Sequence, residues 1–430
     1  MPDSKLTFRG IAPIYSPLSL HLGVDQFSKE FYKSLKAIKL EHIIDNNGNQ
    51  TSLDLQGKFL HLGGQQNEER QYQSTNTNSK DVRLMCWSPS DNDGVMFHVF
   101  SNHIAIAEVE LTIDITEFQT LASSTEKLVA LIEERVQNLA EAQVELYFSN
   151  FCQDLQALKS YLPQGFIYSE ASSAESGNWV ARTMLLSNEQ LVKENMANIL
   201  TAWLRNTSRP QDAADIIAGK KEYSMTWLNY AVKDAKAVGD DPNIQIMVLA
   251  QYYYVSQENC NSALRGAIEV AYGRTKIQKT DKILAGTRTA CRLNQIAYFE
   301  NIKFLNRPNR ALLEDILSGW EFNQLVENSE RMIELCDTRL QEEDNKKRER
   351  STIMTDFLLV GLSFFAVFEL SLYLTEFSRE MMSRPALDYN DSKSSYFLSV
   401  IAEIDVDIMF SFGFGLTLLL IVVYRYIKRN

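Results

Sequence analysis

The sequence lacks the residue patterns that mark the common enzyme and metal sites. It contains no P-loop, no GxGxxG or GxSxG motif, and no cysteine or histidine set with the spacing of a zinc site. We therefore expect no enzyme activity, no cofactor and no bound metal. The cysteines are few and scattered, with no sign of a disulfide framework, which is typical of a reducing compartment. They are Cys86, Cys152, Cys260, Cys291 and Cys336.

An excess of positive charge is also missing. Asp and Glu number 55 against 43 Lys and Arg, a formal net charge of −12, which argues against general affinity for nucleic acid. The first residues, MPDSKLTFRG, lack the basic-then-apolar pattern of a signal peptide, so we expect none. With 430 residues and a mean hydropathy of −0.22, most of the chain is expected to form two or three soluble domains.

Long apolar runs are scarce, and the two that occur lie near the C-terminus. Residues 357–377 and 408–427 are each almost wholly apolar over about 20 residues, the length of a helix that crosses a bilayer. We predict two transmembrane helices. The basic flanks place both ends of the pair in the cytoplasm, with 378–407 as an acidic external loop of an inner-membrane protein. These flanks are Lys346, Lys347, Arg348 and Arg350 before the first run, and Arg425, Lys428 and Arg429 after the second.

The larger N-terminal part is expected to be cytoplasmic. Strands are predicted at 84–87, 95–100 and 104–115, and in the last of these apolar and polar residues alternate; after residue 116 the apolar spacing becomes helical. The predicted fold class is an α+β cytoplasmic N-terminal domain, an all-α middle with a long stalk helix, and two C-terminal transmembrane α-helices. The segments are the N-terminal domain 1–116, the helical domain 117–309, the stalk 310–356, the first span 357–377, the external loop 378–407 and the second span 408–427.

One long helix is predicted to run from about residue 310 into the membrane. No proline occurs between Arg310 and Phe377, and apolar residues recur there at near-heptad spacing. Such spacing favours either a stalk packed against neighbouring chains or an amphipathic helix packed on its own domain, and both interpretations stay open. The spacing is carried by Leu325, Met332, Cys336 and Leu340.

The first apolar run contains one carboxylate near its middle, Glu369. A charge at that depth costs about 2.5–3.5 kcal/mol, so such a residue usually faces a bundle interior or a water-filled path. Residues seven apart share one face of a slightly supercoiled helix. In a homo-oligomer that face could line a pore, with Glu369 and Glu376 as carboxylate rings that select cations. The pore-lining candidates are Thr355, Leu362, Ala366, Glu369, Tyr373 and Glu376.

Two other roles for Glu369 stay open. It could hydrogen-bond in its protonated form to a neighbouring helix, at Ser411 or Thr417, or extend toward the membrane interface. The second run offers two small-residue pairs, Ser411 with Gly415 and Gly413 with Thr417, that permit close helix contact. We therefore expect the second helix to pack outside the first and to face lipid.

One basic stretch departs from the acidic background. Clustered Arg and Lys suit phosphate groups, so the stretch predicts a nucleotide or oligonucleotide ligand that gates the pore. The alternatives are a solvated helical face or pairing with acids of a neighbouring chain. Nearby, Tyr252, Tyr253 and Tyr254 could stack on bases or belong to the core. The candidate anion-binding residues are Arg274, Lys276, Lys279, Lys282, Arg288 and Arg292.

This layout resembles the CorA-type magnesium channels, which have a cytoplasmic α/β domain, a helical middle, a long helix entering the membrane and two C-terminal spans. The resemblance implies a homo-oligomer whose first transmembrane helix lines the pore. The Gly-Met-Asn signature of that family is replaced by Thr375, Glu376, Phe377 and Ser378, so magnesium selectivity is not carried over. The layout is also similar to two-span membrane effectors of bacterial antiviral defence, in which a cytoplasmic domain senses a signal and opens a pore.

The sequence thus predicts a homo-oligomeric membrane channel gated by its cytoplasmic domain, with lipid, copies of itself and a nucleotide as partners. The alternative is a membrane-anchored binding or scaffold protein whose two helices only tether it. A third hypothesis is a membrane-bound enzyme with its site in residues 1–116. The first two differ in the direction of Glu369: toward a central axis in a channel, and toward a helix of its own chain in a tether.

Overall fold

The computed structural model describes most of the chain. It contains two compact units, Met1–Cys336 and Asp337–Asn430, and helix α10, Phe322–Ser383, contributes to both. The described residues are 5–21, 43–44, 50–51, 55–60, 82–170, 180–192, 194–205, 209, 211–225, 228–273, 280–383 and 396–429.

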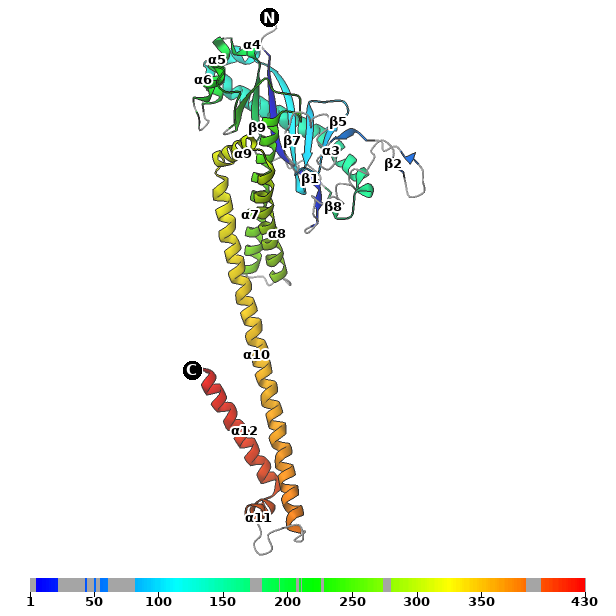
Figure 1. Ribbon diagram of the computed structural model, residues 1–430, viewed down its shortest axis with the longest axis vertical. Coiled ribbons are helices and arrows are strands. Elements are labelled where there is room, and N and C mark those ends of the chain that lie inside the picture. The colour runs from blue at the N-terminus through cyan, green and yellow to red at the C-terminus, as the bar shows by residue number, and fades with distance from the viewer. Residues whose placement is uncertain are drawn as a thin grey trace. The chain divides into compact units, whose positions relative to one another are not determined.

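The first unit is built on a nine-stranded sheet (Figure 1). Its strand order is β10-β11-β9-β1-β7-β6-β5-β4, and β8 pairs with β1 outside this path. β11 and β9 are parallel, and the other pairs are antiparallel. The strands are β1 Lys5–Leu20, β4 Gly57–Leu60, β5 Met85–Pro89, β6 Val95–Val99, β7 Asn102–Asp114, β8 Phe166–Tyr168, β9 Ala181–Leu186, β10 Tyr223–Ser224 and β11 Asn229–Lys233; β2 Ile43–Ile44 and β3 Gln50–Thr51 form a separate ribbon.

Strand β1 lies at the centre of the sheet. It pairs with β7 from Lys5, opposite Asp114, to Tyr15, opposite Ile104, and with β9 on its other edge. Further along, Leu18 of β1 pairs with β8. β1 therefore joins strands from both sides of residue 116 into one sheet.

The three predicted strands are confirmed as β5, β6 and β7, with bounds that shift by one or two residues. The expectation of an all-helical middle is corrected, because β8, β9, β10 and β11 lie there and complete the sheet. These strands are only two to six residues long and take their partners from distant segments, so their local sequence carries little periodic signal. The boundary expected at residue 116 lies inside one unit.

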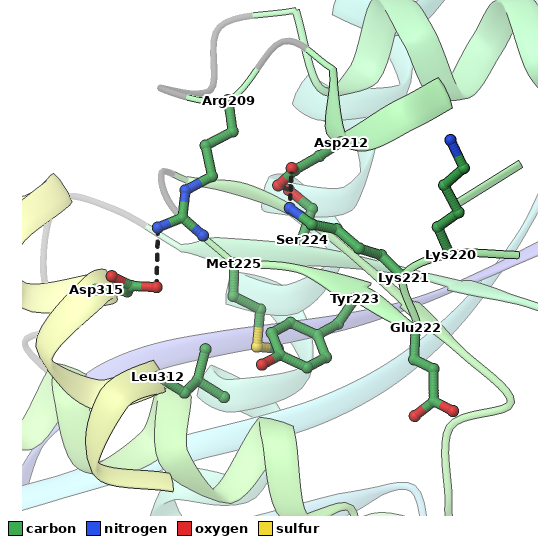
Figure 2. A pocket seen from close by; sticks show the side chains of 10 residues that line it. All are labelled: Arg209, Asp212, Lys220, Lys221, Glu222, Tyr223, Ser224, Met225, Leu312 and Asp315. Carbon is green, nitrogen blue, oxygen red and sulfur yellow. Dashed lines mark hydrogen bonds and ion pairs between the residues drawn. The ribbon is translucent and has the colours of Figure 1, made fainter. Parts of the chain in front are cut away.

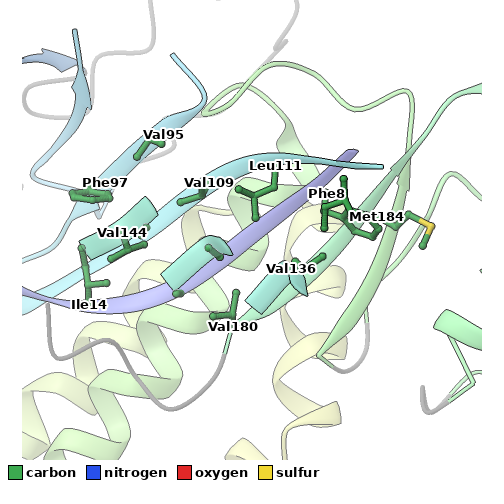
Figure 3. Packing of buried hydrophobic residues seen from close by; sticks show 14 of the residues in the cluster. Phe8, Ile14, Val95, Phe97, Val109, Leu111, Val136, Val144, Val180 and Met184 are labelled. Atoms are coloured by element: carbon green, nitrogen blue, oxygen red, sulfur yellow. The ribbon is translucent and has the colours of Figure 1, made fainter. Parts of the chain in front are cut away.

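Helices cover both faces of the sheet. Alternate residues of β1 and β7, such as Phe8 and Val109, point into a core where Val136 and Val144 of α3 pack (Figure 3). Ile11 of β1 points the other way, into a second core shared with α7 and α9. The first unit is therefore a sheet between two helical layers, as the period of two along a strand requires.

The rest of the chain is mostly helical, but the long helix predicted from residue 310 is interrupted. α9 ends at Gly319, and Glu321 has a left-handed φ of 55° before α10 begins. A left-handed residue cannot continue a right-handed helix. The helices are α2 Thr116–Leu121, α3 Thr125–Leu158, α4 Asn188–Leu191, α5 Glu194–Trp203, α6 Asp212–Ile217, α7 Pro242–Tyr272, α8 Thr280–Asn301, α9 Arg307–Gly319, α10 Phe322–Ser383, α11 Tyr396–Glu403 and α12 Val406–Arg429; short 3₁₀ helices occupy Lys159–Tyr161 and Ile302–Phe304.

The first turns of α10 pack on the first unit. The ring of Phe322 lies 5.3 Å from that of Tyr298 on α8, and the Asn261 side chain of α7 donates to the Leu325 carbonyl at 3.0 Å. Cys336, at the end of this segment, is buried. For residues 322–336, these contacts favour a helix packed on its own domain over a stalk that needs neighbouring chains.

A buried charged network ties the sheet to the segment before α7. Arg9 of β1 donates to Glu108 of β7 at 3.2 Å, and their side chains are 1% and 0% exposed. Glu108 also accepts from the Gly239 backbone N–H at 3.2 Å and from the Gln245 side chain at 3.3 Å. The Nε2 atom of His98 lies 3.0 Å from the same carboxylate. Buried charges require such partners.

These contacts control the ionisation of Glu108. Burial alone would raise the pKa of its carboxyl, but the hydrogen bond and charge of His98, the charge of Arg9 and the Gly239 N–H outweigh burial and hold the pKa below the ordinary 4.5. Because the folded-state pKa is depressed, ionised Glu108 stabilises the fold at pH above about 4.5. That contribution is lost as the pH falls through the folded-state pKa.

We expect Glu108→Gln to lower the free energy of unfolding by about 3–5 kcal/mol at pH 7, because it leaves Arg9 buried without its full counter-charge. The loss should shrink as the pH falls below about 4.5, where the carboxyl of the unfolded chain takes up a proton, and it should vanish below the lower folded-state pKa, where the folded carboxyl is also neutral. Denaturant unfolding followed by tryptophan fluorescence measures both effects.

The matched control is Glu314→Gln. Glu314 accepts from Arg310 one turn earlier at 2.8 Å, and both side chains are about half exposed. Exposed pairs contribute little, so this change should stay within about 0.5 kcal/mol. Equal losses in the two variants would contradict the role given to the buried network.

Candidate functional site

The candidate site lies on the apolar part of α10, within the second unit. Among the described helices, the stretch Phe322–Met381 alone contains a window long and apolar enough to cross a membrane, judged by length and composition. In α12 the apolar part with described side chains, Asp407–Leu419, is shorter. The pattern is therefore one long apolar helix and one shorter apolar helix.

α12 folds back along one face of α10 (Figure 1). The ring of Phe368 lies 5.1 Å from Phe410, and that of Phe364 lies 5.8 Å from Phe414, so the two helices run antiparallel. On α10 the contact residues recur every three or four positions, as a single helix face requires. They are Val360, Gly361, Phe364, Val367, Phe368 and Ser371.

The predicted pore-lining residues lie on the opposite face of α10. An α-helix turns about 100° per residue, which places Glu369 about 140° and Tyr373 about 180° around the axis from Phe364. The seven-residue spacing seen in the sequence is therefore one face, and α12 does not cover it. All six candidates are exposed in the chain: Thr355, Leu362, Ala366, Glu369, Tyr373 and Glu376.

Glu369 has no hydrogen-bond partner among the described residues. It lies on the face of α10 away from α12, and it makes no bond to either of the partners expected for it there. Ser411 donates to the Asp407 carbonyl at 2.7 Å, and Thr417 donates to the Gly413 carbonyl at 2.8 Å. Both hydroxyls thus bond to the backbone of their own helix, one turn back.

The two small-residue pairs of α12 behave differently. A Cβ added at Gly413 would lie 3.0 Å from Val367 Cγ1 and 3.4 Å from the Ser371 hydroxyl, so Gly413 permits the close contact with α10. Thr417 is buried on the same side. Gly415 has nothing within 4 Å of an added Cβ and does not take part.

The predicted basic site is only partly placed. Arg274, Lys276 and Lys279 lie outside the described residues, whereas Lys282, Arg288 and Arg292 lie on α8.

The nearby tyrosines belong to the core. Tyr252 and Tyr253 are 5% and 6% exposed, and Tyr252 stacks on Phe100 with ring centres 3.9 Å apart. Tyr254 packs edge-to-face on Trp320 at 5.5 Å. These contacts leave Tyr252 and Tyr253 no open face for a base.

A pocket of about 260 Å³ lies elsewhere in the first unit, around β10 and α9 (Figure 2). Lys221 pairs with Asp212, and Arg209 pairs with Asp315 at 2.9 Å. An anion would have to compete with these carboxylates, so the pocket does not substitute for the predicted basic site. It is lined by Arg209, Asp212, Lys220, Lys221, Glu222, Tyr223, Ser224, Met225, Leu312 and Asp315.

Comparison with protein-family models, curated proteins and solved structures found no match. The functional argument therefore rests on the two faces of α10 and on the contacts just described.

We expect Gly413→Leu to destabilise the packing of α12 on α10 by about 1–3 kcal/mol, because the added side chain collides with Val367 and Ser371. Gly415→Leu is the matched control, since it adds the same atoms where the chain is open. Unfolding of detergent-solubilised protein by increasing sodium dodecyl sulfate, followed by circular dichroism, measures the difference. Equal losses of stability in both variants would show that the close contact at Gly413 does not contribute to the packing of α12 on α10.

Proposed function

We propose that this chain is the subunit of a homo-oligomeric, cation-conducting membrane channel gated by its cytoplasmic part. The observation that carries the proposal is the position of Glu369. It lies within the apolar stretch of α10, on the face opposite α12, and is exposed in the chain. A carboxylate in that position needs water or polar neighbours, and a ring of equivalent helices around an aqueous path supplies both.

The second unit suits a hairpin that crosses the membrane twice. α10 supplies one span, and α12, which runs antiparallel to it, supplies the second. Both ends of the hairpin then lie on the cytoplasmic face of an inner membrane, where the basic flanks meet anionic lipid. α12 takes the outer position and faces lipid.

Copies of α10 would meet through the face that α12 leaves open. Glu369 then forms one carboxylate ring, and Glu376, two turns further along the same face, forms a second. Rings of acidic side chains favour cations over anions. Thr355 and Tyr373 add polar groups to the same wall.

The tether hypothesis receives less support. It requires Glu369 to bond to a helix of its own chain, yet Glu369 lies on the face of α10 away from α12 and has no hydrogen-bond partner among the described residues. A tether also gives no reason for Glu369 and Glu376, the two carboxylates of the apolar stretch, to lie together on the face away from α12. The channel hypothesis accounts for both observations.

We expect purified protein in liposomes to conduct cations, and Glu369→Gln to change the rate or the cation-over-anion selectivity of that flux. The control is Glu349→Gln, which removes an exposed carboxylate from α10 before the apolar stretch and on another face. Flux is measured with and without candidate nucleotides. Identical flux in Glu369→Gln and wild type would remove Glu369 from the conduction path.

A cysteine placed on the open face should link neighbouring subunits. In membranes treated with a mild oxidant, we expect Leu362→Cys to give disulfide-linked dimers. Phe364→Cys should not, because Phe364 packs against Phe410 and Phe414 of its own chain. Wild type controls for the native cysteines. Cross-linking at 364 but not at 362 would place the oligomer contact on the wrong face for this channel.

A further inference from the structure

Two cysteines that are far apart in sequence meet across the α7–α8 hairpin. α7 and α8 pack side by side in the first unit. Their register is given by two contacts: the rings of Tyr253 and Tyr298 lie 4.9 Å apart, and Ser256 donates to the Asn294 side chain at 2.7 Å.

The same register brings Cys260 opposite Cys291. Cys260 follows Tyr253 by seven residues, and Cys291 precedes Tyr298 by seven, which is about two helical turns in each case. The contact is direct: the Sγ atom of Cys291 lies 3.6 Å from the Cys260 carbonyl oxygen. In this contact the Cys291 thiol donates to the Cys260 carbonyl, so the two side chains lie next to each other.

The two thiols differ in environment. The hydrogen bond from Cys291 lowers the pKa of Cys260 against the effect of burial, with help from Asn294. The same hydrogen bond raises the pKa of Cys291, as do burial and the charge of Cys260. Cys260 is partly exposed, whereas Cys291 is 2% exposed. Cys260 is thus the more easily deprotonated and the more accessible of the two thiols, and Cys291 is its buried neighbour.

We propose that Cys260 and Cys291 form a reversible disulfide in response to hydrogen peroxide. The Cys260 thiolate attacks one peroxide oxygen, the O–O bond breaks, and the departing hydroxide takes a proton to become water. Cys260 is oxidised by two electrons to a sulfenic acid. The Cys291 sulfur then attacks the Cys260 sulfur, the S–O bond breaks, and hydroxide leaves as a second water with the Cys291 proton.

The other cysteines are less suited to the first step. Burial raises the pKa of the Cys152 thiol to about 12, so it stays protonated at neutral pH. Cys86 and Cys336 are both 0% exposed and are closed to peroxide in the folded chain. Cys336 lies close enough to Cys291 for its charge to act there, which makes it the competing partner that a test must distinguish.

The disulfide would covalently join α7, which covers one face of the sheet, to α8. Intracellular disulfides are commonly transient and redox-sensing, and a thiol reductant restores both cysteines by exchange. This inference does not depend on the channel function, because every residue that carries it lies in the first unit.

The test uses the reduced, purified full-length chain. The protein is treated with one equivalent of hydrogen peroxide and unfolded in denaturant, so that N-ethylmaleimide reaches every remaining thiol. The digest is then mapped by mass spectrometry. We expect two of the five cysteines to escape the label and to appear in one cross-linked peptide pair, Cys260 with Cys291. Dithiothreitol should restore both thiols.

Two conservative variants separate the steps. Cys260→Ser should slow peroxide consumption by about tenfold or more, because it removes the reactive thiolate. Cys291→Ser should leave Cys260 as a sulfenic acid that dimedone traps. A Cys291–Cys336 disulfide, prior oxidation of Cys152, or over-oxidation of Cys260 without a cross-link in wild type would each overturn the proposal. The disulfide map of the wild-type protein tests the proposal even if a variant folds poorly.

Discussion

The backbone ladder of β1 is the constraint on which the first unit depends. This strand of 16 residues occupies the middle of the sheet, with β7 on one edge and β8 and β9 on the other. Without β1, the strands before residue 116 and those after residue 166 have no common partner. Arg9 is buried because it lies on this central strand, where alternate side chains enter the core on one face of the sheet or the other. Glu108 of the neighbouring strand pairs with the charge of Arg9 and offsets part of the cost of burying it.

A second constraint shapes α10. A carboxylate on an apolar helix must be buried in protein, paired or hydrated, because hydrocarbon offers it neither a partner nor water. The aromatic and small residues of α10 form one face, and α12 packs there through Phe410, Gly413 and Phe414. The two carboxylates of the apolar stretch, Glu369 and Glu376, lie on the other face. One surface of the helix thus contacts its own chain and the other is exposed, and our proposal makes the exposed surface the wall of a pore.

The α7–α8 hairpin combines two roles in one register. Tyr252 and Tyr253 fasten α7 to the sheet and to α8, so the sliding of one helix along the other is blocked by large rings. The fixed register is what holds Cys260 beside Cys291. A redox-active pair needs two sulfurs that stay within reach, and the rigid aromatic packing nearby supplies that geometry.

Features that repeat locally could be predicted from the sequence. Alternation predicted β7, the absence of proline predicted a long helix up to Phe377, and spacing of seven predicted that Thr355, Leu362, Glu369 and Glu376 share a face. Such patterns can be recognised within a short segment, because a helix or strand shows its own residue periodicity whatever it packs against. That the face is open was not predictable, because it depends on where α12 packs.

The remaining features depend on contacts between distant parts of the chain. β1 contains two prolines and a glycine and shows no clean alternation, so its place in the sheet comes from pairing with residues about a hundred positions away. The pairs Arg9 with Glu108 and Cys260 with Cys291 have no motif, because each partner comes from a different element. The break at Glu321 depends on one left-handed residue in an otherwise helical pattern. Non-local contacts leave no periodic trace in the sequence, and they assemble the sheet, the charged network and the cysteine pair.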